Sequence, residues 1–217
     1  MKHEKTAPRE LRIAVLGSGR GSNFGSIADG IRNGTIPNTK IVVVISNNSR
    51  AGILNRAREH GIPAMHLSEG QFPGAGAYVS AFLRELRRYD VNFIVLAGYM
   101  KRIPEAIVDT FRNRIINIHP ALLPKFGGKG MFGENVHRAV LESGETESGA
   151  TVHLVDEEYD RGPIVLQRKV PVLGSDTVET LAHRVLAVEH EIYPDAIRLF
   201  AEGRVSFDQQ ESVVQHH

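Results

Sequence analysis

Short apolar runs alternate with amphipathic segments through the first half of this chain. The apolar runs predict buried strands at residues 11–16, 40–46, 63–67, 92–97 and 115–118. The segments between them predict helices at residues 24–32, 51–60, 77–89 and 103–111. Because strands and helices alternate, we expect an α/β fold with a doubly wound, mostly parallel sheet that is Rossmann-like in its N-terminal half.

The pattern changes in the C-terminal third of the chain. Two strands at residues 149–155 and 164–170 are separated by a turn at 159–163, which predicts an antiparallel hairpin. A long C-terminal helix opens at residues 176–179, which have the spacing of a capping box. The apolar stripe of this helix runs past Pro194, which we expect to kink or split it.

The chain shows no internal repeat and no segment typical of an interdomain linker. Its 217 residues are enough for one domain with a sizeable core. We therefore expect a single domain over residues 11–205, with a disordered segment at 1–10 and a flexible tail at 206–217.

Composition narrows the class of protein. A hydrophobic content of 41% and a charged content of 24% are ordinary for a soluble globular protein. The net charge of +1 gives no basic surface for nucleic acid, and no apolar run approaches the roughly 20 residues of a membrane span. Cysteine is absent, which excludes disulfides and fits a cytoplasmic location. We expect small-molecule ligands, no nucleic acid or membrane partner, and a monomer or homodimer.

The predicted strand at residues 115–118 carries the strongest candidate chemistry. Asn117 and His119 are two positions apart, so in a strand both point to the same face. An amide can donate a hydrogen bond to a developing oxyanion, and an imidazole can move a proton near neutral pH. Pro120 and Pro124 then stiffen the loop that follows.

An acid and further polar groups are available to this pair. Asp160 lies in the turn of the hairpin, and a carboxylate beside His119 would fix its tautomer and raise its pKa. Thr151 and His153 share one face of a neighbouring strand and are candidates for supporting contacts. A set made of His119, His137, His153 and Asp160 could also be read as metal ligands. Their spacing matches no metal motif, so we expect no metal.

Two loops at strand ends are candidate ligand sites. The glycine-rich loop at residues 17–23 favours a single phosphate group, because Ser22 replaces the last glycine of a dinucleotide fingerprint and no acid ends the next strand. A tight turn without a ligand remains the alternative. After the strand at 92–97, Tyr99 and Met100 could pack on a flat heterocycle, or the segment could be an ordinary loop with a basic surface pair.

These segments together resemble the folate-dependent formyltransferase family. The resemblance covers residues 12–205 and is closest to the members that act on glycinamide ribonucleotide in de novo purine synthesis. It rests on six motifs, which are SGRGSN (18–23), LAGYM (96–100), NIHPALLPK (117–125), GATVH (149–153), DRGP (160–163) and EHEIYP (189–194). The implied activity is transfer of a formyl group from 10-formyltetrahydrofolate, a co-substrate, to the ribonucleotide amine, with no permanently bound cofactor.

The resemblance also implies roles for individual residues. Asn117, His119 and Asp160 would be catalytic. The phosphate of the ribonucleotide would be held by Gly21, Ser22 and Asn23, and its ribose by Glu189. The folate would be held by Met100, Lys101, Arg102 and Ile103, together with Asn117.

The chain departs from the family pattern in two places. Many relatives carry an arginine for the folate tail just before the helix that holds Tyr78, but residues 74–77 here read GAGA. Lys101, Arg102 or another basic residue is therefore expected to replace it. The loop at residues 126–135 is longer than the shortest family versions and is expected to be a mobile flap over the site.

Rival functions within the same fold are also considered. A formyltetrahydrofolate hydrolase uses water as the acceptor and would typically carry an extra N-terminal domain, which the 10 residues before the first predicted strand do not provide. A tRNA-directed relative would carry a further C-terminal domain and a basic surface. A non-enzymatic folate or phosphate binding module would not need the three catalytic candidates.

Overall fold

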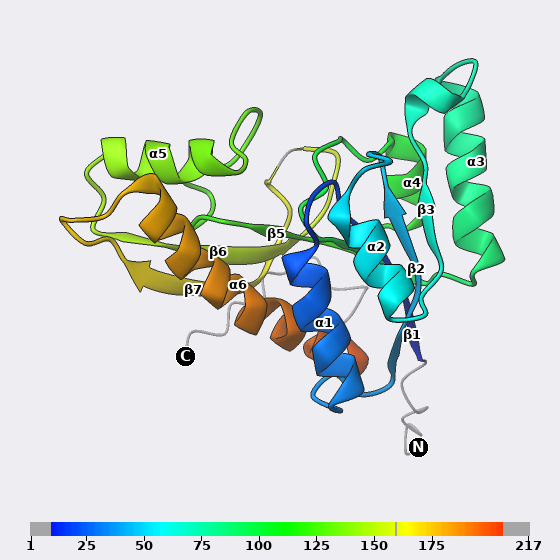
Figure 1. The fold of residues 1–217 in the computed structure, drawn as a ribbon, viewed down its shortest axis with the longest axis horizontal. Coiled ribbons are helices and arrows are strands. Elements are labelled where there is room, and N and C mark those ends of the chain that lie inside the picture. Colours follow the sequence, from blue (N-terminus) through cyan, green and yellow to red (C-terminus); the bar gives the residue numbers. More distant parts are fainter. Residues whose placement is uncertain (1–9, 159, 206–217) are drawn as a thin grey trace, which may run out of the picture.

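The computed structural model describes residues 10–158 and 160–205 (Figure 1). Apart from Glu10, the expected disordered segment at 1–10 and tail at 206–217 lie outside the described residues. The described strands form one sheet in the order β3-β2-β1-β4-β5-β6-β7. Their bounds are β1 Leu11–Leu16, β2 Thr39–Ser46, β3 Ala64–His66, β4 Phe93–Leu96, β5 Ile115–His119, β6 Glu147–Leu154 and β7 Ile164–Pro171.

The first five strands are parallel, and β6 and β7 are antiparallel to their neighbours. This arrangement confirms the predicted doubly wound, mostly parallel sheet with a C-terminal antiparallel hairpin. The helices are α1 Ser22–Arg32, α2 Gly52–Glu59, the short 3-10 helix η1 Glu69–Gln71, α3 Ala75–Arg88, α4 Glu105–Thr110, α5 Glu134–Glu142 and α6 Val178–Ala201. None of the described helices is long and apolar enough to cross a membrane.

Helices cover both faces of the sheet, as Figure 1 shows. Apolar residues of α1, α2 and α6 pack on one face, where Phe24, Ile53 and Ile197 are fully buried. Residues of α3 and α4 pack on the other, where Phe82 and Ile107 are fully buried. The continuous apolar runs in the strands follow from this double cover, because neither face of the parallel strands meets solvent.

The helical predictions need two corrections. Helix α6 is continuous through Pro194, so this proline does not split it. Pro194 is buried within the helix, and Tyr193 beside it is fully buried and donates a hydrogen bond to the Leu96 carbonyl at 2.8 Å, so tertiary packing holds the helix where one backbone bond is lost. The cap lies one residue later than expected, because Thr177 and Thr180 form the capping box.

Helix α5 was not anticipated from the sequence pattern, because it follows a glycine-rich loop and is only nine residues long. Its buried positions Val136 and Val140 are four residues apart, which is a helical spacing. In Figure 1, α5 lies beside the first part of α6, at the end of the molecule formed by β6 and β7.

Candidate active site

Strand β5 delivers Asn117 and His119 to the carboxyl edge of the parallel strands. Asn117 is opposite His153 of β6, and His119 is opposite Thr151. The amide nitrogen of Asn117 lies 3.2 Å from Nε2 of His153. Nδ1 of His153 donates to the Leu154 carbonyl at 2.8 Å, because a carbonyl oxygen can only accept, and Nε2 is therefore the ring nitrogen that faces the Asn117 amide. His153 therefore orients the side chain that is the candidate oxyanion donor.

Thr151 supports the site from outside the cavity. Its buried hydroxyl donates to the Ala121 carbonyl at 2.6 Å. The same oxygen accepts from the Leu123 amide at 3.1 Å and from Nε2 of Gln167 at 2.9 Å. These bonds fasten the loop that follows β5 and so fix the direction in which the chain leaves that strand.

Asp160 lies beside both histidines. Its Oδ2 is 3.6 Å from Nδ1 of His119, and its Oδ1 is 3.6 Å from Nε2 of His153. The carboxylate also accepts a hydrogen bond from the Gly128 amide at 2.9 Å. Asp160 has a φ of 54°, a left-handed conformation that aspartate tolerates better than most residues. The hairpin turn thus bends back and brings its acid to the end of β5.

Burial controls the protonation of this cluster. His119 is only 3% exposed, and this burial lowers its pKa from 6.5, although Asp160 and the Phe126 carbonyl both act to raise it. Asp160 does act to raise the pKa of His119 as expected, but desolvation outweighs the carboxylate, so the net pKa is lowered. Burial acts to raise the pKa of Asp160, but contacts with His153 and the Gly128 amide outweigh it and lower that pKa. At neutral pH the pair is a neutral imidazole beside a carboxylate.

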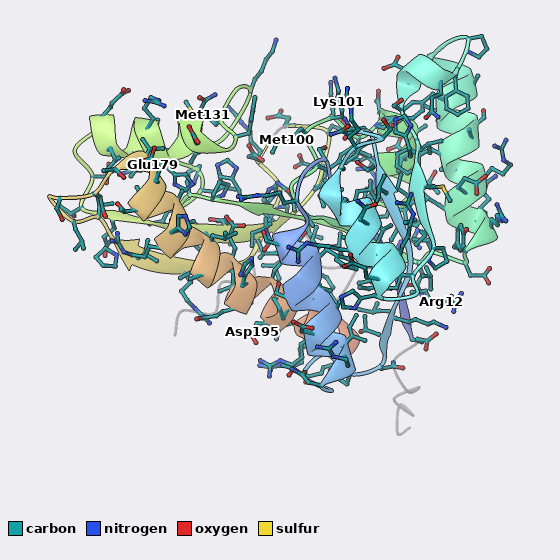
Figure 2. The ribbon with its side chains drawn as sticks, in the orientation of Figure 1. Arg12, Met100, Lys101, Met131, Glu179 and Asp195 are labelled. Atoms are coloured by element: carbon teal, nitrogen blue, oxygen red, sulfur yellow. The ribbon has the colours of Figure 1, made fainter. Side chains whose placement is uncertain are left out.

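A cavity of about 640 Å³ opens over this cluster. Its size suits one or two small organic molecules. The candidate residues that line it are Asn117, His119, His153, Asp160, Met100, Lys101, Arg102, Ile103, Asn23 and Glu189. In Figure 2, Met100 and Lys101 lie on one side of this cavity, and Met131 and Glu179 lie on the other.

The candidate phosphate loop contributes unequally to the cavity. Asn23 lines it, whereas Gly21 and Ser22 are not among the lining residues. Gly21 has a φ of +80°, and a Cβ there would come within 2.9 Å of the Ile53 backbone, so this turn requires glycine for packing alone. Gly21 is followed by the first turn of α1, which has no side-chain cap. Amides of that turn are the donors that an anion would use.

Glu189 and Asn23 are hydrogen-bonded neighbours in the cavity wall. The Asn23 amide nitrogen donates to Oε2 of Glu189 at 2.7 Å, while Oδ1 of Asn23 is buried without a hydrogen-bond partner. Burial raises the pKa of Glu189 to about 6, and the bond from Asn23 opposes that rise. An unpartnered carbonyl oxygen repels phosphate but suits a hydroxyl donor, so the Asn23 side chain fits a sugar better than an anion.

The segment after β4 forms another part of the cavity wall. Met100 is 53% exposed there, which leaves its thioether available to a flat ligand. The guanidinium of Arg102 donates to the Glu157 carbonyl at 2.8 Å and therefore braces the loop that leads to Asp160. Lys101 is exposed at the rim of the same cavity.

The sequence indicates His137 only as a possible metal ligand and indicates no role for Phe126. His137, on the unanticipated helix α5, is 5% exposed, and its Nδ1 is buried without a partner in the cavity wall. Phe126 contributes its backbone carbonyl, which accepts from Nε2 of His119 at 2.8 Å. No side-chain pattern could have indicated a backbone contact. Among the described residues, no group of three or more His, Asp or Glu side chains is arranged to hold a metal ion.

Comparison with known proteins gives a consistent result. The formyl transferase family model matches residues 11–197. The chain is 45% identical over 201 residues to the chloroplastic phosphoribosylglycinamide formyltransferase of Arabidopsis thaliana, covering 92% of this chain and 68% of that protein. It is 40% identical over 195 residues to the Escherichia coli phosphoribosylglycinamide formyltransferase, covering 90% of this chain and 89% of that protein. The crystal structure of glycinamide ribonucleotide transformylase 1 from Symbiobacterium toebii has a TM-score of 0.85 and 46% identity, with 92% of each chain covered.

Proposed function

Because the chain belongs to the formyl transferase family, we propose that it transfers the formyl group of 10-formyltetrahydrofolate to the glycine amine of glycinamide ribonucleotide, a step of de novo purine synthesis. Its relatives from a plant and a bacterium carry the corresponding name, and the family implies a formyl folate as the donor. Both ligands are small molecules, and the donor is a substrate rather than a resident cofactor.

One observation carries the proposal. Asn117, His119 and Asp160 line the same cavity as Asn23 and Glu189, so a proton-transfer cluster and groups suited to a ribose open onto one space. A hydrolase needs only a site for folate and water. Polar groups for a second substrate in the same cavity favour an amine acceptor that is anchored at a distance from the reacting atom.

The reaction follows from the proton states of the cluster. The acceptor amine attacks the formyl carbon, and the carbonyl oxygen becomes an oxyanion. The Asn117 amide donates to that oxygen, and a donor of this kind is worth roughly 3–4 kcal/mol of transition-state stabilisation. Neutral His119 takes the proton lost by the attacking nitrogen, and Asp160 stabilises the imidazolium that results. His119 then returns this proton to the departing folate nitrogen as the carbon–nitrogen bond breaks.

We assign the two substrates to opposite parts of the cavity wall. The phosphate of the ribonucleotide lies at the first turn of α1, held by the amides of Ser22 and Asn23 after Gly21, and Glu189 contacts the ribose hydroxyls. The folate lies against the segment after β4, which presents Met100, Lys101, Arg102 and Ile103 to the cavity. Between them, Asn117 faces the formyl group.

The proposal is tested by measuring folate product formed from 10-formyltetrahydrofolate with and without glycinamide ribonucleotide. Rapid turnover is expected only with the ribonucleotide, accompanied by one formylated acceptor for each folate released. Equal turnover with water alone would assign the protein as a formyltetrahydrofolate hydrolase instead. Binding of both ligands without turnover would indicate a binding module.

A further inference from the structure

The glycine-rich segment after β5 is bonded directly to both ionisable groups of the cluster. The carbonyl of Phe126 accepts from Nε2 of His119 at 2.8 Å. Two residues later, the amide of Gly128 donates to Oδ2 of Asp160 at 2.9 Å. One short stretch of backbone therefore fastens the imidazole with an acceptor and the carboxylate with a donor.

The backbone of this segment is in an uncommon conformation. Phe126 has a φ of 57° and Gly128 a φ of 101°, and Asp160 on the facing turn has a φ of 54°. Left-handed conformations are disfavoured for phenylalanine, so the surrounding structure must hold this one in place. They turn the carbonyl of Phe126 and the amide of Gly128 toward two different side chains. The two hydrogen bonds to His119 and Asp160 therefore depend on this backbone conformation.

These contacts fix which ring nitrogen is free. A carbonyl oxygen can only accept, so Nε2 of His119 carries the hydrogen and Nδ1 carries the lone pair of the neutral ring. Nδ1 is 3.6 Å from Oδ2 of Asp160, which is too long for a direct hydrogen bond. A proton that arrives at Nδ1 would lie on the side of the ring facing that carboxylate.

We propose that residues 126–128 are a positioning element that holds His119 with Nδ1 as the atom that carries the transferred proton and aims Asp160 at that atom. The inference rests on the proposed function and deepens it. Nδ1 takes the proton from the attacking amine as the new carbon–nitrogen bond forms. It returns the proton to the folate nitrogen as the old bond breaks, and Asp160 stays ionised throughout.

This assignment divides the expected flap into two parts. Residues 126–128 carry the hydrogen bonds to the cluster, and Gly128 also lines the cavity. Residues 129–133 line the cavity without such a bond to His119 or Asp160, and Phe132 among them is 54% exposed. The titratable groups that face His119 are Asp160 from the hairpin turn, His153 from β6 and His137 from α5. Because several groups act on His119, the effect of displacing residues 126–128 must be measured on the tautomer and pKa of the His119 ring.

The test is Gly128→Ala. A Cβ at this position meets no atom within 4 Å, so the substitution acts through the φ of +101° and not through a clash. We expect kcat to fall at least about tenfold while KM for both substrates stays within about twofold, because the cluster is displaced and the substrate-binding walls are not. The matched control is Gly144→Ala, which has a φ of +72°, equally open surroundings and a place outside the cavity. It should keep the wild-type kcat.

Nitrogen-15 NMR of His119 supplies a readout that a merely structural role would not move. The wild-type neutral ring should be the Nε2–H tautomer, and Gly128→Ala should mix the tautomers and lower the pKa of His119 further. This measurement needs no substrate, so it stands apart from a failure of the formyl-transfer assay. An Nδ1–H tautomer in the wild type would overturn the proposal. So would a Gly128→Ala protein that is folded and keeps the wild-type kcat, or one that loses kcat with the tautomer and pKa unmoved.

Discussion

Glu189 offers a quantitative test of how the candidate site is held. Glu189 lies on α6 and is 8% exposed, and its carboxylate accepts one hydrogen bond from Asn23. Burial raises its pKa from 4.5 to about 6, with the Asn23 bond opposing the rise. The ionised form is therefore costly in the folded protein. Glu189→Gln keeps an oxygen that can accept from Asn23 and removes the charge.

The size and sign of the effect follow by linkage. A pKa that rises from 4.5 to about 6 on folding corresponds to about 2 kcal/mol, since each tenfold change in proton affinity is about 1.4 kcal/mol. For a raised carboxyl pKa, this stabilisation is fully present below pH 4.5 and is lost as the pH rises through about 6. Glu189→Gln should thus match the wild type in acid and exceed its free energy of unfolding by up to about 2 kcal/mol above neutral pH.

Urea unfolding across this pH range measures the difference directly. The control is Glu191→Gln on the same helix, because the Glu191 side chain is 63% exposed and pairs with Arg168 at the surface. Its effect should stay below about 1 kcal/mol at every pH. A difference between wild type and Glu189→Gln that is constant with pH would refute the reasoning. If Glu189 holds the ribose, the stabilised variant should also show a raised KM for the ribonucleotide, which is the cost that stabilising a functional site usually carries.

Three further outcomes are expected. Asp160→Asn should lower the pKa of His119 followed by NMR and reduce kcat by orders of magnitude with both ligands still bound; an unmoved pKa would separate the two residues. Because the pKa of His119 lies below 6.5 and its neutral form is the base, kcat should be constant above that pH and fall in more acidic buffer; a fall that begins above pH 6.5 would contradict this. Lys101→Ala should weaken folate binding most at low ionic strength, whereas Arg102→Ala, which frees the Glu157 carbonyl, should lower kcat at any salt concentration; identical salt responses in titrations of the two variants would refute the distinction.

The sequence was sufficient for most of the fold because the parallel strands are buried on both faces. Uninterrupted apolar runs such as that at residues 41–45 have few alternative interpretations. Helix α5 is harder to predict from the sequence, because its only apolar pattern is Val136 and Val140 after a glycine-rich loop. The expected split at Pro194 does not occur, because the packing of Tyr193 and its neighbours outweighs the local backbone preference of proline.

The sequence predicts which candidate residues share a strand face, but it does not predict the electrostatics of the cluster they form. Strand alternation placed Asn117 with His119 and Thr151 with His153, and the sheet register pairs them across β5 and β6. Strand alternation predicts which face a side chain lies on, but not whether that face borders the cavity or is covered by another loop. The sequence therefore does not show that the hydroxyl of Thr151 binds the loop after β5 and does not line the cavity. Likewise, the effect of Asp160 on His119 was anticipated, but the stronger opposing effect of burial depends on packing that only the folded chain defines.

The topology explains why these groups meet. The strand order reverses direction between β1 and β4, so the loops that follow these strands diverge and leave a crevice at their carboxyl ends. Ser18 and Gly98 tie the two loops together at 3.0 Å, which fixes the floor of the crevice. Strand β5 then brings His119 to the same edge. Because β6 runs antiparallel to β5, the hairpin turn after β6 starts at the far end and must fold back for Asp160 to reach His119. An acid on so long a return needs hydrogen bonds that hold it in place. The amide of Gly128 binds the carboxylate of Asp160 directly, and Arg102 braces the loop that leads to it.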